Sequence, residues 1–326
     1  MYIDTVFVLS DDVLNSGQNV VCSLSVSPWY AQYPNSMVDL QDVFFVDRFR
    51  GWAVGVLAGD LTRSAILFRT TDGGLNWSDS LVFTSPEDSS LLGTIRFIDE
   101  TGWIVGDPGI ILYTTDGGDN WNSQSTDLAD TTISLNDLFF ISVDTGWIVG
   151  DSGLILKTTD GGINWMQKTS NTFQHLFGVT FIDGANGWVA GNFNVILHTS
   201  DGGETWNKQT SGDFDYRDVY FVDLNNGWMV GKLGTIMNTT DGGINWLAQP
   251  TPVTSNLSSI FFINDSTGWA TGENGVILYT STGGSIWTQQ LSDTDQWLFS
   301  IYFIDELTGW VVGENGTIRF TSSGGN

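Results

Sequence analysis

The chain has 326 residues, with 37 Asp plus Glu against 11 Lys plus Arg, and therefore a formal net charge of −26. So few basic residues argue against nucleic acid and membrane partners, because phosphate backbones and anionic lipid surfaces are both bound through Lys and Arg. Hydrophobic residues make up 41 % of the chain and include 15 Trp and 20 Phe, which excludes disorder and predicts a substantial core.

Cys22 is the only cysteine, so an intramolecular disulfide, a cysteine zinc site and a CxxC redox pair are excluded. No run of about 18 apolar residues predicts a membrane span, and the N-terminus lacks a basic segment followed by an apolar one. We expect a monomer that does not insert into membranes and is periplasmic or secreted, without a signal peptide in the present chain.

Two short motifs recur about every 41 residues, a period typical of repeat architectures. The turn motif Thr-Thr-Asp-Gly-Gly-x-Asn-Trp occupies residues 158–165, and close copies lie at 70–77, 114–121, 199–206 and 239–246. The motif degenerates at 280–287, where Thr282 replaces the Asp, and it breaks off at 321–326. The second motif is a Gly-Trp pair, with its Trp at Trp52, Trp103, Trp147, Trp188, Trp228, Trp269 and Trp310. A unit this small cannot bury its own apolar faces, so seven units must fold as one domain.

Residues 1–28 contain no repeat, only short β-branched stretches that are compatible with strands. The segment that follows begins with Trp29, which precedes Phe45 by the same distance as Trp246 precedes Phe262. Since the last turn motif stops before its Trp, residues 29–35 are predicted to supply the final strand of the last unit. We therefore expect an N-terminal extension over 1–28 and one domain over 29–326.

Each unit is predicted to form four short strands. In the third unit these are residues 135–141, 146–149, 154–158 and 165–168, separated by turn residues rich in Asp and Gly. No segment has a helical period. Four antiparallel strands per unit predict the blade of a β-propeller, so the fold class is an all-β, seven-bladed propeller.

The Asp of the turn motif has a structural interpretation. Its carboxylate can accept hydrogen bonds from the main chain of its own loop, and the Gly-Gly pair allows positive φ. A phosphate-binding role would require a following lysine and helix, which are absent. The structural positions are Asp72, Asp116, Asp160, Asp201 and Asp241.

The complete repeat, with Phe-Ile-Asp, Thr-Gly-Trp-Ile-Val-Gly and the turn motif, resembles that of the photosystem II assembly and stability factor family. Its turn is similar to the Asp box, or BNR repeat, of sialidases. The resemblance implies a seven-bladed, non-catalytic protein-binding scaffold, whose photosynthetic members are associated with an arginine-rich surface. The arginines of this chain are instead scattered, which favours a role outside photosynthesis; they are Arg48, Arg50, Arg63, Arg69, Arg96, Arg217 and Arg319.

Candidate binding residues lie in connections on the face opposite the Asp-box turns. Blades one to three carry insertions there, and the connections between blades carry aromatic residues that we expect to be exposed, namely Phe173, His175, Phe214, Tyr216 and Trp297. The residues predicted to bind a ligand or partner are Asp60, Arg63, Glu87, Asp88, Asp127, Asp130, His175, Asp215, Tyr216, Arg217 and Trp297. A second candidate is a polar rim that follows each Val-Gly, formed by Asp107, Asp151, Asn192, Lys232, Glu273 and Glu314. Turn preference alone also explains that rim.

The alternative is a carbohydrate-binding or sialidase-like glycoside hydrolase that uses the same face. Such an enzyme needs clustered arginines, a Tyr nucleophile and acidic partners, and only Tyr216 and Arg217 with Asp215 and Asp218 resemble this set. No catalytic residue is assigned. No cofactor is expected apart from a bound cation such as calcium, and His175 and His198 do not predict a metal site.

Overall fold

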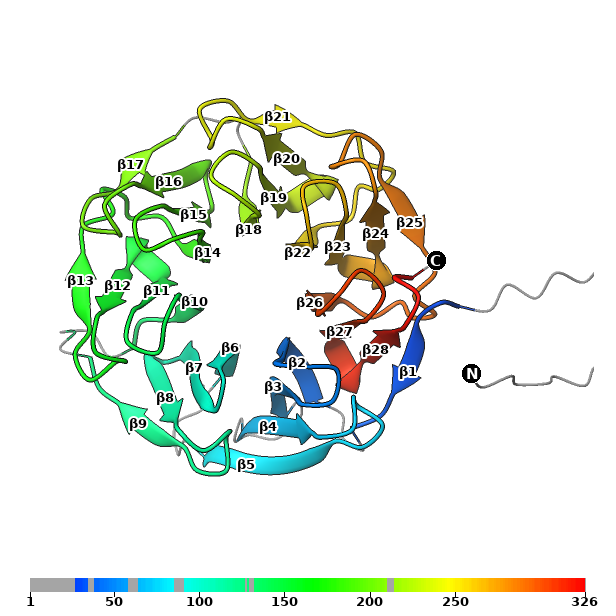
Figure 1. Ribbon diagram of the computed structural model, residues 1–326, viewed down its shortest axis with the longest axis horizontal. Coiled ribbons are helices and arrows are strands. Elements are labelled where there is room, and N and C mark those ends of the chain that lie inside the picture. The colour runs from blue at the N-terminus through cyan, green and yellow to red at the C-terminus, as the bar shows by residue number, and fades with distance from the viewer. Residues whose placement is uncertain are drawn as a thin grey trace, which may run out of the picture.

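A ring of β-sheets surrounds a central channel in the computed structural model (Figure 1). The structure describes residues 27–34, 38–57, 64–84, 91–126, 128, 132–209 and 214–325. Their strands form seven four-stranded antiparallel sheets, each of them one blade. The predicted all-β, seven-bladed propeller is confirmed. In the described part of the chain, no helix has the length and apolar character needed to cross a membrane.

The blades follow one another around the ring, each with its first strand next to the channel (Figure 1). Blade 1 consists of β2 (Val38–Phe45), β3 (Gly51–Leu57), β4 (Ser64–Thr70) and β5 (Ser78–Thr84). Blade 2 consists of β6 (Leu91–Ile98), β7 (Thr101–Asp107), β8 (Ile110–Thr114) and β9 (Asn122–Gln124). Blade 3 consists of β10 (Leu135–Phe140), β11 (Gly146–Gly150), β12 (Ile155–Thr158) and β13 (Met166–Lys168). Blade 4 consists of β14 (Leu176–Phe181), β15 (Gly187–Gly191), β16 (Val195–Thr199) and β17 (Asn207–Lys208).

The remaining blades have the same order. Blade 5 consists of β18 (Tyr216–Phe221), β19 (Gly227–Gly231), β20 (Ile236–Thr239) and β21 (Leu247–Ala248). Blade 6 consists of β22 (Leu257–Phe262), β23 (Gly268–Gly272), β24 (Ile277–Thr280) and β25 (Thr288–Gln290). Blade 7 consists of β26 (Leu298–Phe303), β27 (Gly309–Gly313) and β28 (Ile318–Thr321), with β1 (Tyr30–Gln32) as its fourth strand. Four 3-10 turns occur among the described residues: η1 (Asp151–Gly153), η2 (Lys232–Gly234), η3 (Glu273–Gly275) and η4 (Glu314–Gly316).

The ring closes between the two ends of the described chain. Strand β1 pairs antiparallel with β28, with Tyr30 opposite Phe320, and Figure 1 shows the two strands side by side. Trp29 is 1 % exposed and packs edge-to-face on Phe303 of blade 7, with ring centroids 5.9 Å apart. Trp29 therefore occupies the place of the missing Asp-box Trp, and the predicted closure is confirmed.

Stacked aromatic pairs join neighbouring blades. In each pair the Trp of the Gly-Trp motif stacks on the Phe that ends the first strand of the next blade; Trp147 and Phe181, for example, have ring centroids 3.6 Å apart. The indole Nε1 of Trp147 also donates to the carbonyl oxygen of Gly202 in that next blade. The seven pairs are Trp310–Phe45, Trp52–Phe97, Trp103–Phe140, Trp147–Phe181, Trp188–Phe221, Trp228–Phe262 and Trp269–Phe303. The repeated tryptophans are therefore core residues that fix each blade to its neighbour.

Each Asp box is held by hydrogen bonds within its own turn. Asp160 accepts from the main-chain N–H and the side-chain amide of Asn164, and it also accepts from the Thr158 hydroxyl. Hydrogen bonds from Asn120 and Thr205, respectively, lower the pKa values of the equivalent Asp116 and Asp201 to about 2. These carboxylates are acceptors that are already occupied, which agrees with a structural role.

Candidate functional site

The two faces of the ring differ in their loops. The turns between the first and second strands and the Asp-box turns lie at one face, which we call the Asp-box face. The hairpins between the second and third strands and the connections between blades lie at the other. A cavity of about 730 Å³ occupies the channel and reaches this second face through Asp107, Ser134, Asn256 and Trp297. We call this opening the channel mouth.

A bulge in every first strand determines which side chains enter the channel. The register shifts near the start of each strand, for instance between Tyr216 and Asp218 in β18. Because a bulge redirects the side chains around it, the bulged Arg217 turns into the cavity while Asp218 faces blade 6. The same position as Arg217 is filled by Phe177 in β14 and by Phe299 in β26, both of which line the cavity.

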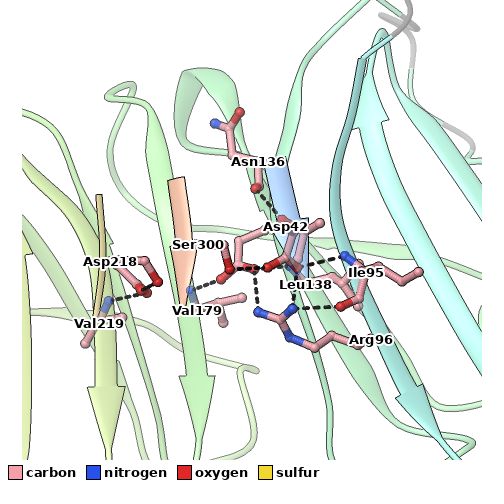
Figure 2. Close-up of polar contacts among 12 residues, drawn as sticks. Asp42, Ile95, Arg96, Asn136, Leu138, Val179, Asp218, Val219 and Ser300 are labelled. Carbon is pink, nitrogen blue, oxygen red and sulfur yellow. Dashed lines mark hydrogen bonds and ion pairs between the residues drawn. The ribbon is translucent and has the colours of Figure 1, made fainter. Parts of the chain in front are cut away.

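Three buried carboxylates beside the bulge join alternate pairs of blades. Asp42 accepts from the main-chain N–H of Ile95 in blade 2, at 3.0 Å. In the same way Asp137 accepts from Val179 in blade 4 at 2.8 Å, and Asp218 from Ile260 in blade 6 at 2.9 Å. Blade 7 is joined to blade 1 by the Ser300 hydroxyl, which donates to Asp42 at 2.6 Å. Figure 2 shows Asp42, Val179, Asp218 and Ser300 on their separate strands.

Arg96 is the cation of this network. Its guanidinium donates to Asp42 (Figure 2). Its second terminal nitrogen lies 3.8 Å from Asp137. Burial opposes the charge, but the two carboxylates raise the pKa of Arg96, so it stays protonated. Burial raises the pKa of Asp137 to about 7, against the opposing effect of Arg96, and burial likewise raises that of Asp218 to about 6.

An arc of aromatic rings lines the channel further along the first strands than the bulges, toward the Asp-box face. Phe44 and Tyr302 have centroids 4.8 Å apart, Tyr302 and Phe261 are 5.4 Å apart, and Phe261 and Tyr220 are 5.0 Å apart. All four rings are half-buried and line the cavity. Burial raises the pKa of Tyr302 to about 12 and also raises that of Tyr220, so both hydroxyls are protonated donors at neutral pH.

Two pairs of side chains flank the cavity nearer the mouth. The guanidinium carbon of Arg217 lies over the ring of Phe177, 4.5 Å from its centroid. On the other side Trp297 packs against Phe299 at 5.3 Å, and its indole N–H donates to the Ser258 hydroxyl at 2.6 Å. These contacts fix a cation and two large rings at the edge of the cavity.

Apolar side chains also project from the hairpin tips of blades 4 and 5. Phe193 and Leu233 are 69 % and 74 % exposed, and their φ angles are 49° and 57°. Polar residues occupy the corresponding tips of blades 3, 6 and 7, namely Ser152, Asn274 and Asn315. Asp215 connects the two apolar tips, since it accepts from the Phe193 N–H and from the ammonium of Lys232, the residue before Leu233.

The structure brings some of the predicted binding residues together. Arg217 and Trp297 both line the cavity, and Asp215 lies at the mouth beside the apolar tips. Nδ1 of His175 lies 2.8 Å from Oδ1 of Asp151, also at the mouth. The candidates in the insertions lie outside the described residues; they are Asp60, Arg63, Glu87, Asp88, Asp127 and Asp130.

The expectation that Tyr216 is exposed is wrong. Tyr216 is 0 % exposed and packs in the core cluster of Trp188, Val219 and Trp246. It occupies the strand position that holds Leu176 in blade 4, so its ring replaces a core leucine. The four residues from Asp215 to Asp218 therefore point to a hairpin tip, the core, the cavity and the next blade, and they do not form a sialidase-like cluster.

The polar rim is engaged in local contacts. Asp151 accepts from Asn136, Lys232 pairs with Asp215, and Glu273 accepts from Asn256. Such contacts favour the turn-forming interpretation of the rim. Among the described residues, no group of three or more His, Cys, Asp or Glu side chains is arranged to hold a metal ion. Binding of a cation such as calcium therefore stays a prediction without an assigned site.

The sequence analysis missed Phe193, Leu233, Phe177, Phe299 and the aromatic arc. The sequence did contain a signal for the two tips, because alignment of the units places Phe193 and Leu233 where the hairpins of blades 3, 6 and 7 carry Ser or Asn. The arc was harder to detect, because alternation along a strand does not reveal where a bulge exchanges the two faces.

Taken together, the closed ring of blades and the repeated Asp-box turns define the class as a seven-bladed β-propeller of the BNR-repeat type. Comparison with known families agrees. The family described as photosynthesis system II assembly factor YCF48 matches residues 21–131, 123–212 and 212–293, and the chain belongs to this family.

Individual relatives are distant. The photosystem II assembly lipoprotein Ycf48 of Synechococcus sp. (strain CC9902) is 32 % identical over 92 residues, which is 28 % of this chain and about a quarter (26 %) of that protein. The structure of YCF48 bound to D1 peptide has a TM-score of 0.76 at 22 % identity and covers 95 % of this chain and 100 % of that one. The GH74 enzyme of Niastella koreensis has a TM-score of 0.67 at 14 % identity, covering 90 % of this chain and 56 % of that one. Both structural similarities show a shared fold.

Proposed function

We propose that this protein is a non-catalytic assembly scaffold that binds a peptide segment of a protein partner at the channel mouth. The observation that carries the proposal is the pair of apolar hairpin tips, Phe193 and Leu233. A left-handed backbone costs an L-residue with a bulky side chain roughly 1–2 kcal/mol. Side chains that remain about 70 % exposed recover little of that cost through burial in the fold. Their placement is therefore best explained by contact with a partner.

The surroundings of the tips favour a peptide as the ligand. Phe214 is 37 % exposed, and its carbonyl accepts from the N–H of Asn194, so Phe214 lies beside the Phe193 tip. The tips of blades 4 and 5 thus form an apolar patch on the face at which the cavity opens. Exposed apolar residues that border a hollow are typical of interaction sites. The relative that was solved with a bound D1 peptide supports the same class of ligand.

We further infer that the partner is not a photosystem subunit. Recognition through clustered arginines would require free guanidiniums, but Arg50, Arg69 and Arg96 are each paired with a carboxylate. Arg319 donates to the main-chain carbonyls of Ser292 and Asp293. A synthetic D1 peptide should therefore bind no more tightly than a scrambled control in isothermal titration calorimetry, and tight, sequence-specific binding would reject this inference.

The experiment for the proposed function uses a displayed library of random 12-residue peptides, selected on the immobilised full chain. Selected peptides should bind the Phe193→Asn/Leu233→Asn variant at least about tenfold more weakly, since each lost apolar anchor removes roughly 1 kcal/mol or more. The matched control is Leu75→Asn/Ile163→Asn, which removes two side chains that are 81 % and 77 % exposed on the Asp-box face. Loss of binding in the control variant alone would place the binding site on the Asp-box face and contradict the proposal. Failure to select any peptide would also reject it.

A carbohydrate ligand at the same mouth is the second candidate, favoured by the half-buried Trp297 with Phe299 beside it. Aromatic rings at the edge of a cavity are suited to stacking on sugars. A glycan array in which the full chain binds, and Trp297→Ser does not, would favour this candidate over the peptide.

We also propose an extracytoplasmic location, periplasmic or secreted. The description of the Synechococcus relative as a lipoprotein supports export for the family. Cell fractionation of the native host, with an antibody to this protein, tests the proposal; recovery in the cytoplasmic fraction would reject it.

A further inference from the structure

We infer that the channel cavity receives an aromatic side chain of the bound peptide. This inference rests on the proposed function and names the residue type that the site recognises. We call the receiving part of the cavity the aromatic cup; its floor is the arc of Phe44, Tyr302, Phe261 and Tyr220, and its walls are the Arg217–Phe177 and Trp297–Phe299 pairs.

The rings of the floor are tilted relative to one another. Its ring planes meet at 46° between Phe44 and Tyr302, at 61° between Tyr302 and Phe261, and at 46° between Phe261 and Tyr220. Tilted rings of this kind present both edges and faces to a group placed above them. Another ring can then make edge-to-face or offset contacts, which add about 0.5–1.5 kcal/mol to the area it buries.

Hydrogen-bond donors also lie in the cup. They are the Tyr220 and Tyr302 hydroxyls, which stay protonated, and the Arg217 guanidinium over the Phe177 ring. The carboxylates near the cup are directed into the blade interfaces, where Asp42, Asp137 and Asp218 accept from main-chain N–H groups. The cup therefore offers ring faces to a ring and hydroxyl donors to a main-chain carbonyl, while the three carboxylates that line the cavity are already engaged as acceptors.

The charges at the cup reinforce this selectivity. Arg96 is directed at Asp42 and lies over the Phe44 ring of the floor, 5.9 Å from its centroid. Arg217 adds a second positive charge at the wall. A Lys or Arg side chain of the partner would approach both cations, and the three carboxylates beside them are already occupied by main-chain N–H groups, whereas an uncharged ring is not repelled. Basic residues of a partner are therefore directed to the outer acidic surface and its aromatic residues to the cup.

The size of the cup also fits. The cavity volume of about 730 Å³ lies within the range of roughly 300–1,000 Å³ found for ligand pockets, which leaves room for one large side chain with its flanking main chain. Trp297 is held by its hydrogen bond to Ser258, so this wall is formed before a ligand arrives.

The direct test uses N-acetylphenylalaninamide and N-acetyllysinamide as probes on the intact full chain, followed by saturation-transfer NMR of the probe. We expect saturable transfer to the phenyl ring at millimolar concentration, with Kd at least about fivefold lower than for the lysine probe. Trp297→Ser/Phe299→Ser should abolish the preference, whereas Phe49→Ser, a residue 56 % exposed on the Asp-box face, should leave it intact. Equal binding of both probes, stronger binding of the lysine probe, or no effect of the double substitution would overturn the inference.

A second measurement separates this inference from the proposed function. Peptides selected from the random library are scanned with alanine, and their affinity is compared between the wild type and Trp297→Ser/Phe299→Ser. An aromatic residue that is essential in the wild type and dispensable in the variant supports the aromatic cup. Peptides that need Phe193 and Leu233 but contain no essential aromatic residue would overturn the cup and leave the scaffold function standing. Saturable probe binding without any selected peptide would reject the scaffold function and keep the aromatic pocket.

Discussion

The Asp-box face and the channel mouth are built from the same repeated unit, yet they differ in regularity. At the Asp-box face the turns of blades 1 to 5 keep the same Asp, with the same hydrogen bonds to its turn, and the Trp of the next strand is repeated in blade 7 by Trp29. At the channel mouth the equivalent positions change from blade to blade, as between Asn274 and Leu233 at the hairpin tips. Positions that keep the same residue in most blades therefore stabilise the ring. Positions where the residue differs between blades are the candidates for binding.

The largest expected effect concerns a repeated residue. Trp29→Ala removes the edge-to-face contact with Phe303 and the hydrogen bond to Gln290, both of which join the N-terminal strand to the ring. Truncation of a fully buried Trp costs about 3–5 kcal/mol, so the free energy of unfolding in urea should fall by that amount. The neighbouring Tyr30→Ser, at a site 53 % exposed, should change it by less than about 0.5 kcal/mol. Equal effects of the two substitutions would contradict closure through Trp29.

A comparable loss is expected at the network that separates the two faces. Asp42→Ala leaves the Arg96 guanidinium buried without its main partner and the Ile95 N–H without an acceptor. Breaking one side of a buried ion pair costs about 3–5 kcal/mol. Chemical denaturation should also show that Asp42→Ala/Arg96→Met recovers part of this loss, because the unpaired charge is gone. If the double variant is no more stable than Asp42→Ala, the ion pair is not what Asp42 contributes.

Smaller effects of opposite sign are expected at the hairpin tips. Phe193→Asn and Leu233→Asn place a residue that tolerates positive φ at a left-handed position, so each should raise stability by roughly 0.5–1 kcal/mol while weakening peptide binding. Asn274→Leu is the reciprocal variant, and it should lower stability by a similar amount. Thermal unfolding measures all three. A loss of stability in Phe193→Asn and Leu233→Asn would mean that the two side chains serve the fold.

The same contrast explains how much the sequence could predict. The spacing of Trp and Phe predicted the blades, and the distance from Trp29 to Phe45 predicted the closure of the ring. Both predictions succeed because a residue that recurs in every unit makes the same contact in every blade. The sequence also pointed to Arg217, together with its neighbours Asp215, Tyr216 and Asp218, and to Trp297 as an aromatic residue in a connection. Tyr216 was misplaced and the arc from Phe44 to Tyr220 was missed because a bulge, which no local pattern indicates, decides which residues turn inward. A site formed by residues that differ from unit to unit is recognised only in the structure, which shows which of these residues lie close together.

The smallest expected effect is a dependence of stability on pH that arises in the interior and not at the Asp boxes. The folded state raises the pKa of Asp137 from 3.8 to about 7, so the fold favours the protonated carboxyl, and its stability falls as pH rises through that interval. Between pH 6 and 8 the Asp boxes remain ionised, because Asp116 and Asp201 have pKa values of about 2.

Urea unfolding of the wild type at pH 6, 7 and 8 should therefore show a decline of at most about 1.4 kcal/mol per pH unit, steepest below pH 7, and Asp137→Asn should flatten it. The contribution of histidines is common to both proteins and cancels in the comparison. The absolute stability of the variant will fall, since an amide cannot accept from both Leu138 and Val179, but the slope depends only on the titration. An unchanged slope in Asp137→Asn would show that Arg96 keeps Asp137 ionised throughout, and that the decline arises from another group, such as Asp218 with its raised pKa of about 6.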